Sequence, residues 1–282
     1  MGNTYYVDTY ASATDDGNAG TDPNYPMTTV AAAMGRCTTD NNDYVIILDA
    51  WTSDTEPITV DKTRVHFVGI NPTPVPMYVV MTPGTDESVF KMGSASNHCE
   101  IAGINLGGGG NHGGIELNDS ANAAYGLWIH DCVFGHEFPG SATPKYGIFN
   151  VQPAGPTYCV IEDNHFYGTT GVAWGKIDVT GMLLYGAKGT IIRRNTFLGL
   201  PTYAISLSTT SGAIIQDNRI SLDTDQTGGA ITLAACTGCW VDGNTANFGD
   251  SDSMGSSPYA DDGSDVNNWG SNWTGNAVDF PA

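Results

Sequence analysis

The chain has 282 residues, 14% of them charged, and its 10 basic and 30 acidic side chains give a formal net charge of −20. This negative balance argues against nucleic acids and anionic membrane surfaces as partners. No apolar run reaches the roughly 18 residues of a membrane-spanning helix, and the first residues lack the basic and apolar regions of a secretory signal. We therefore expect no nucleic-acid or membrane partner and no visible signal peptide.

Residues 1–43 are expected to form an N-terminal cap made of three short elements. A strand at 5–8 is followed by a turn-rich acidic loop at 15–22 and by a short helix at 28–36. Four side chains of the loop carry oxygen ligands of the kind that calcium, a hard cation, takes from such loops: Asp15, Asp16, Asn18 and Asp22. Their spacing differs from that of an EF-hand, so a surface loop without a ligand is the alternative.

After a buried strand at 44–49, a short segment recurs seven times before residue 248. The four best-matched copies carry an asparagine at the same place: Asn164, Asn195, Asn218 and Asn244. An uneven repeat of roughly 20 to 35 residues, each copy holding a short strand and a sharp turn, is typical of a coiled solenoid. A second short strand precedes most copies, which favours a parallel β-helix.

Two positions of the repeat are apolar or small in every copy. Three residues before the asparagine position stand Phe67, Ile101, Ile129, Ile161, Ile192, Ile215 and Val241. Five residues before it stand Val65, Cys99, Leu127, Cys159, Thr190, Ala213 and Cys239. Positions two apart share a face of a strand, so both columns are expected to point into one core. The repeated asparagine is interpreted as a turn residue, because asparagine adopts the left-handed conformation and bonds the backbone.

The beginning of the chain resembles the N-terminal cap of the pectate-lyase-like right-handed β-helix superfamily. The matching pieces are Tyr6-Val-Asp8, Asp16-Gly-Asn-Ala-Gly-Thr21, 26–33 and 42–47. With the repeats, the resemblance covers residues 4 to 246. It implies an all-β fold, a single-stranded right-handed parallel β-helix over 44–246 with a short capping helix, and leaves 247–282 as a polar C-terminal tail or cap.

That superfamily includes polysaccharide lyases, glycoside hydrolases, phage tailspikes and non-catalytic virion proteins, so its fold does not choose a function. Its lyases bring acidic residues, often with calcium, near a basic residue that removes a proton next to a uronate carboxylate. Asp163, Arg194 and Asp217 stack just before the asparagine position and match those roles. The alternative is a surface ion-pair ladder, which the shortage of other basic residues favours.

One outward column is apolar over five consecutive coils. Four residues before the asparagine position stand Trp128, Val160, Ile191, Ile214 and Trp240. A contiguous apolar strip usually marks an interface, so we expect self-association, with three copies as the first expectation, or docking on a larger assembly. The alternatives are that loops or the C-terminal tail cover the strip, or that the two tryptophans stack on sugar rings.

These features favour a structural virion-associated β-helix protein, such as a capsid decoration, fibre or spike of a phage, with glycan binding as an added role. It would be located in the virion or outside the cell. The alternative is a secreted polysaccharide lyase or glycoside hydrolase; a hydrolase would need two carboxylates roughly 5–10 Å apart. Calcium is the one candidate cofactor, and the candidate partners are further copies of the chain, a virion assembly and a polysaccharide.

Overall fold

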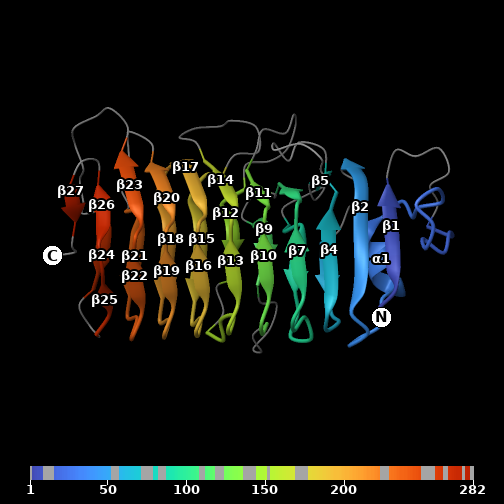
Figure 1. Cartoon of the computed structure of the whole chain (residues 1–282), viewed down its shortest axis with the longest axis horizontal. Coiled ribbons are helices and arrows are strands. Elements are labelled where there is room, and N and C mark those ends of the chain that lie inside the picture. The colour runs from blue at the N-terminus through green and yellow to red at the C-terminus, as the bar shows by residue number, and fades with distance from the viewer. Residues whose placement is uncertain are drawn as a thin grey trace.

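The computed structural model describes residues 2–8, 16–51, 57–70, 79–81, 87–107, 112–117, 124–135, 144–150, 153–168, 177–222, 229–248, 258–262, 266–274 and 277–279. Within them the chain coils about one long axis, and successive coils lie side by side from the N-terminal to the C-terminal end (Figure 1). No helix of this described part is long and apolar enough to cross a membrane.

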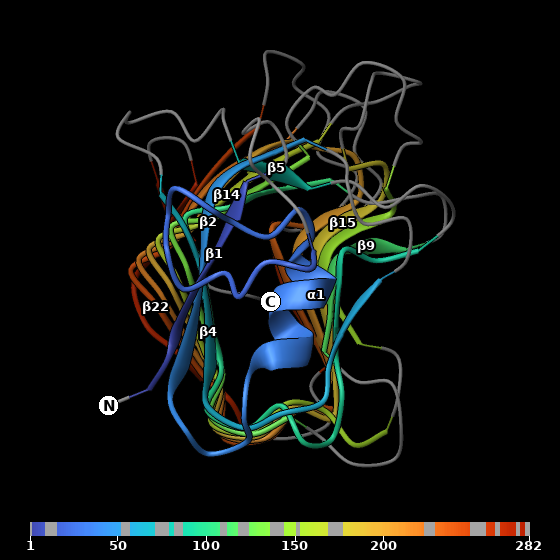
Figure 2. The ribbon, with the colours of Figure 1, turned by 90° about the vertical axis from the view of Figure 1, so that its right-hand side faces the viewer.

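The N-terminal end is closed by a strand and a short helix. Strand β1 (Thr4–Asp8) pairs in parallel with the first half of β2 (Asp43–Trp51). Helix α1 (Val30–Arg36) begins after Thr29, whose side chain accepts a hydrogen bond from the backbone amide of Ala32 and so satisfies one of the free donors of the first turn. The helix lies across the end of the coil (Figure 2), where Val30 and Met34 are buried.

Each complete coil contributes one strand to each of three parallel sheets, which we call A, B and C. Sheet A continues from β2 through β4 (Val65–Gly69), β7 (Glu100–Ala102), β10 (Trp128–His130), β13 (Val160–Glu162), β16 (Ile191–Arg193), β19 (Ile214–Gln216), β22 (Trp240–Asp242) and β25 (Asn268–Trp269). Sheet B continues from the end of β2 through β5 (Val79–Met81), β8 (Asn105–Leu106), β11 (Val133–Phe134), β14 (His165–Tyr167), β17 (Thr196–Leu200), β20 (Arg219–Leu222), β23 (Thr245–Phe248) and β26 (Asn272–Thr274).

Sheet C forms the third wall of the coil. It comprises β3 (Ile58–Val60), β6 (Phe90–Met92), β9 (Gly113–Glu116), β12 (Tyr146–Phe149), β15 (Thr180–Tyr185), β18 (Tyr203–Ser208), β21 (Ile231–Ala234) and β24 (Tyr259–Asp261). From β3 onwards the chain passes in turn from C to A to B, and each strand pairs in parallel with its counterpart one coil away. The predicted all-β parallel β-helix is thereby confirmed.

The core is built from inward columns that stack from coil to coil. Both columns that the sequence places inside are buried throughout, with at most 1% of any of their side chains exposed. On sheet B, the rings of Phe134, Phe166 and Phe197 are fully buried and stack face to face, with successive centroids 4.6 Å apart. Stacking identical positions lets each apolar side chain pack on its own counterpart above and below.

The corner between sheets A and B has one conformation in successive coils. The residue before the asparagine position has a positive φ, between 53° and 68°, at Gly103, Asp131, Asp163, Arg194, Asp217 and Gly243. The left-handed residue thus stands one position earlier than the sequence interpretation placed it. The asparagines are instead buried, with their carboxamides directed along the stack.

These buried asparagines form a continuous hydrogen-bonded ladder. The Oδ1 atom of Asn218 accepts from the backbone amide and from Nδ2 of Asn195, each at 3.0 Å. Its Nδ2 donates to the carbonyl oxygen of Ile192 at 3.1 Å and to Oδ1 of Asn244 at 2.9 Å. One side chain per coil therefore satisfies backbone groups at a buried corner that the sheets do not reach.

The coil continues past residue 246, where we expected it to end. Strands β24, β25 and β26 pair in parallel with the preceding coil, and Asn272 accepts from the backbone amide of Asn244 at 3.1 Å as a further rung of the ladder. Strand β27 (Ala277–Asp279) then pairs antiparallel with β26. The region expected to be a polar tail thus adds one more coil and a terminal hairpin.

Candidate functional site

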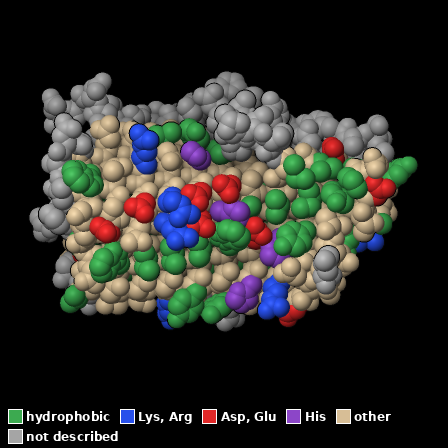
Figure 3. All heavy atoms as spheres, in the orientation of Figure 1, with side chains coloured by type: hydrophobic (Ala, Val, Ile, Leu, Met, Phe, Trp, Pro, Cys, Tyr) green, Lys and Arg blue, Asp and Glu red, His purple; other side chains and the backbone are tan. Residues whose placement is uncertain are grey.

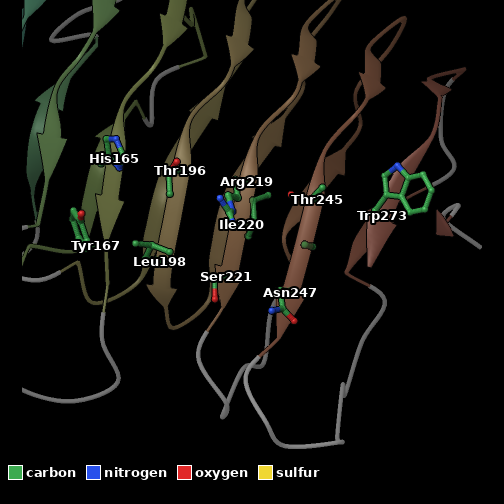
Figure 4. A pocket seen from close by; sticks show the side chains of 11 residues that line it. His165, Tyr167, Thr196, Leu198, Arg219, Ile220, Ser221, Thr245, Asn247 and Trp273 are labelled. Atoms are coloured by element: carbon green, nitrogen blue, oxygen red, sulfur yellow. The ribbon is translucent and has the colours of Figure 1, made fainter. Parts of the chain in front are cut away.

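A groove lies on the outer face of sheet B across five consecutive coils. Its first row consists of residues paired in register, His165, Thr196, Arg219, Thr245 and Trp273. A second, parallel row consists of Tyr167, Leu198, Ser221 and Asn247. The groove has a volume of about 1100 Å³ (Figure 4). Five strands at the usual spacing of about 4.8 Å make it roughly 19 Å long.

The lining combines aromatic surface with hydrogen-bonding groups. Tyr167 stands at one end and Trp273, whose side chain is 46% exposed, at the other (Figure 4). Between them lie threonine and serine hydroxyls, the Asn247 amide and the Arg219 guanidinium. The described lining residues include no carboxylate. Such a surface can bind an elongated ligand that has both apolar faces and hydroxyl groups.

Sequence analysis did not identify this groove. The side chains of the two rows point outward because successive strand residues face opposite sides, and the residues between them, such as Phe197, Ile220 and Ala246, are buried in the core. The signal was the alternation after each asparagine, where the first and third residues are polar in several copies while the second is apolar. Trp273 was assigned to the tail and not to a coil.

On sheet A, the structure brings two of the three proposed lyase residues together. Arg194 bonds both oxygens of Asp163, with Nε to Oδ1 at 2.9 Å and Nη2 to Oδ2 at 2.7 Å. Its Nη2 also contacts Oε2 of Glu162 at 2.7 Å. In the described part of the chain, Asp217 makes no ion pair with Arg194.

This geometry is unfavourable for proton abstraction by Arg194. The hydrogen bonds to Asp163, and to a smaller extent those to Glu162, stabilise the charged guanidinium and raise the pKa of Arg194 above its ordinary value. A general base must lose its proton near the working pH, so the two carboxylates act against that role. The arrangement favours a structural ion pair at the left-handed corner. The catalytic role of the three residues stays a prediction.

The ion pair belongs to a longer network across the outer face of sheet A. Glu162 also accepts from Nε1 of Trp128 at 2.9 Å, and the Trp128 ring stacks on His130, with centroids 3.9 Å apart. His130 in turn contacts Glu100 at 2.9 Å, which contacts His66 at 2.7 Å. Charged and histidine side chains gather near the middle of this face (Figure 3).

Two carboxyl groups of this network, those of Glu100 and Glu162, are held in their charged form. Bonds from His130 and His66 lower the pKa of Glu100 to about 2. Burial raises the pKa of Glu162, but the bonds from Arg193 and Trp128 outweigh it, so that the pKa is lowered. A glycosidase acid needs the opposite, a carboxyl group whose pKa is raised enough to keep its proton.

Replacing Arg194 by alanine is expected to lower the free energy of unfolding by about 1 kcal/mol or less, because the side chain is partly exposed and its ion pairs are screened by solvent. Urea denaturation of the wild type and the variant measures the difference. The matched control is Arg64→Ala, which removes an exposed arginine 4.0 Å from Asp40. A polysaccharide-cleaving activity that is present in the wild type and lost only on replacing Arg194 would instead support the lyase.

The apolar strip predicted from the sequence is formed on sheet A. Its five members, Trp128, Val160, Ile191, Ile214 and Trp240, pair in register from coil to coil. Trp128 is 42% exposed and Trp240 is 47% exposed, and the three aliphatic side chains between them are partly exposed. Its role as an interface stays a prediction.

The candidate calcium ligands have hydrogen-bonding functions within the cap. Asp15 lies outside the described residues. The Asp16 carboxylate accepts from the backbone amides of Thr28 and Thr29, each at 2.9 Å, just before α1. Asp22 accepts from Asn24, and the Asn18 amide donates to the carbonyl of Pro26. Among the described residues, no three His, Cys, Asp or Glu side chains are grouped so as to hold a metal. Calcium binding stays a prediction.

Comparison with known protein families assigns the chain to one family. The family described as "Right handed beta helix region" matches residues 91–275, and the chain belongs to this family. The superfamily and the right-handed β-helix fold expected from the sequence are thereby confirmed. Comparison with curated proteins gave no match.

Among solved structures, the chain is similar to the Dettilon tailspike protein gp208, with 15% identity, a TM-score of 0.43, and coverage of 96% of this chain and 68% of that one. It is also similar to the alginate lyase from Paenibacillus sp. str. FPU-7, with 15% identity, a TM-score of 0.47, and coverage of 88% and 96%. The GH136 lacto-N-biosidase from Eubacterium ramulus has 11% identity, a TM-score of 0.41, and coverage of 98% and 68%. At these identities the likeness concerns the fold alone.

Proposed function

We propose that this protein is a glycan-binding β-helix carried by a phage virion, as a fibre, spike or capsid decoration, or by another extracellular assembly. The observation that carries the proposal is the groove on sheet B. An extended oligosaccharide lying along the coil axis would place the apolar faces of its rings on Trp273 and Tyr167. Its hydroxyl groups would meet the threonine, serine and asparagine side chains between them.

The two outer faces differ in what they offer a ligand. On sheet A, Arg194 already bonds Glu162, and His130 already bonds Glu100, so a ligand would have to break those bonds to use these side chains. On sheet B, Arg219, Thr245 and Asn247 are exposed and face the groove. A polar group that faces solvent can bond a ligand at a lower desolvation cost.

We further propose that binding occurs without cleavage. Hydrolysis of a glycosidic bond needs two carboxyl groups on opposite sides of that bond. The described lining of the groove includes none, and on sheet A the pKa values of Glu100 and Glu162 are lowered. The alternative, a secreted lyase or hydrolase, predicts unsaturated ends or new reducing ends when the protein is incubated with a panel of polysaccharides.

The test is Trp273→Ala, measured by titration calorimetry against oligosaccharides that bind the wild type. We expect at least a tenfold loss of affinity, because stacking on an exposed tryptophan is removed. The matched control is Trp240→Ala, which removes an equally exposed tryptophan, 47% against 46%, from sheet A. A loss caused by Trp240→Ala and not by Trp273→Ala would move the site to sheet A. Wild-type protein that binds no glycan would refute the proposal.

A second copy of the chain is the partner that we propose for the apolar strip. The aliphatic side chains of Val160, Ile191 and Ile214 between the two tryptophans suit packing against another protein better than against a sugar. Three copies whose coil axes run parallel around a common threefold axis would close a ring and bury all three strips.

Ile191→Asp/Ile214→Asp is expected to convert a trimer into monomers, because it would bury charges without partners in the interface. Multi-angle light scattering measures the mass directly. The control is Ser206→Asp/Thr232→Asp, which places the same two charges on neighbouring, paired outward positions of sheet C. A wild type that is already monomeric would contradict the proposal.

A further inference from the structure

We propose that the groove on sheet B selects an acidic glycan, and that Arg219 binds the anionic group of that glycan. This inference rests on the proposed function and adds the chemical class of the ligand. A carboxylate and a sulfate share the relevant chemistry, since each presents at least two negatively charged oxygens that can accept hydrogen bonds from the guanidinium fork.

The first observation is that Arg219 stands apart from the other arginines. Arg193 and Arg194 bond to carboxylates, Arg64 lies 4.0 Å from Asp40, and Arg36 donates to the carbonyl of Asn18. Among the described residues, the Arg219 side chain has no hydrogen-bond or ion-pair partner. The other four arginines each have a carboxylate or carbonyl partner, so Arg219 is the arginine that the described residues leave available to a ligand.

The second observation is the position of Arg219 within the groove. It occupies the middle of the first row, between Thr196 and Thr245, with His165 at one end and Trp273 at the other (Figure 4). Each end lies two strands away, at roughly 10 Å. A ligand whose anionic group bonds Arg219 can therefore place a neighbouring ring on Trp273 and hydroxyl groups on both threonines.

The third observation concerns charge. The only formal charges among the described lining residues are basic, Arg219 and, when it is protonated, His165. The overall charge of −20 repels a polyanion at a distance, but salt at physiological strength screens that repulsion beyond about 8 Å. An acidic glycan that reaches the groove therefore meets the positive charge of Arg219. A neutral glycan would gain only hydrogen bonds from Arg219 and no charge pairing.

The experiment compares oligogalacturonate with the same oligomer fully methyl-esterified, a neutral counterpart of nearly the same shape. By titration calorimetry, we expect wild-type protein to bind the acid at least tenfold more tightly than the ester. Arg219→Gln should abolish this preference, and Arg219→Lys should retain part of it, because lysine keeps the charge but loses the fork. Dextran sulfate against dextran gives the corresponding comparison for a sulfated ligand.

Arg64→Gln is the matched control, since it removes one positive charge from an exposed side chain outside the groove. A loss of preference as large as that of Arg219→Gln would mean that net charge, and not Arg219, selects the ligand, and would overturn the inference. Ester bound as tightly as acid by the wild type would overturn it while leaving the glycan-binding function in place. Binding of none of the four ligands would overturn both.

Discussion

Replacing Asn218 by alanine is expected to lower the free energy of unfolding by about 3–5 kcal/mol, because it removes a central rung of the buried asparagine ladder. Four hydrogen bonds are lost together, two to Asn195 and one each to Ile192 and Asn244. The backbone amide of Asn195 and the carbonyl of Ile192 lose these buried side-chain partners, at about 1–3 kcal/mol for each unsatisfied group. Urea denaturation followed by tryptophan fluorescence measures the change.

The control for this prediction is Asn268→Ala, which removes an exposed, outward-facing asparagine from sheet A two coils further along. Its effect should stay within about 0.5 kcal/mol, as for most surface substitutions. Equal effects of the two substitutions would show that the ladder does not stabilise the coil. A solenoid can also unfold in parts, so loss of a central rung is expected to broaden the unfolding transition.

Phe166→Ala is expected to cost about 3–5 kcal/mol, the usual range for removing a fully buried aromatic side chain. The Phe166 ring lies between those of Phe134 and Phe197 and would leave a cavity with an aromatic ring on both sides. The ring also packs so closely on Gly147 that a Cβ atom there would lie 2.6 Å from it. Because the neighbouring coils are held by their own hydrogen bonds, they cannot collapse fully into the cavity.

Phe166→Leu provides the graded comparison and should lose clearly less stability, since it refills part of the volume with apolar atoms. Thermal unfolding by circular dichroism gives the order wild type, leucine variant, alanine variant. Phe166 lies between His165 and Tyr167 of the groove, so the alanine variant should also weaken glycan binding. An alanine variant as stable as the wild type would contradict the proposed role of the stack.

Local repetition made the coil and its core predictable. Strand residues alternate between two faces, so Ile161 and Ile192 were recognised as inward and Val160 and Ile191 as outward from their order alone. The apolar strip followed from the same rule, because parallel stacking places equivalent positions next to one another. The asparagine repeat indicated the corner, although not which of its two residues has the left-handed backbone.

The ion-pair partners of long side chains could not be predicted from the repeat in this way. The sequence placed Arg194 between Asp163 and Asp217, but the structure pairs it with Asp163 and Glu162. A guanidinium reaches neighbours on either adjacent coil, and its choice depends on the left-handed backbone at Arg194 and on the other groups that bond Glu162. Neither can be read from a repeat.

The sequence by itself therefore determined the parallel β-helix, its inward columns and the apolar strip on sheet A, because each depends only on alternation along a strand and on the register of the repeat. Only the tertiary structure decided where a groove forms. It joins residues from five coils, and Trp273 enters it because the last described coil, formed by β24, β25 and β26, stacks in register after a stretch without a clear repeat. The tertiary structure also left Arg219 without a carboxylate partner among the described residues, because the residues beside it in neighbouring coils are the threonines Thr196 and Thr245.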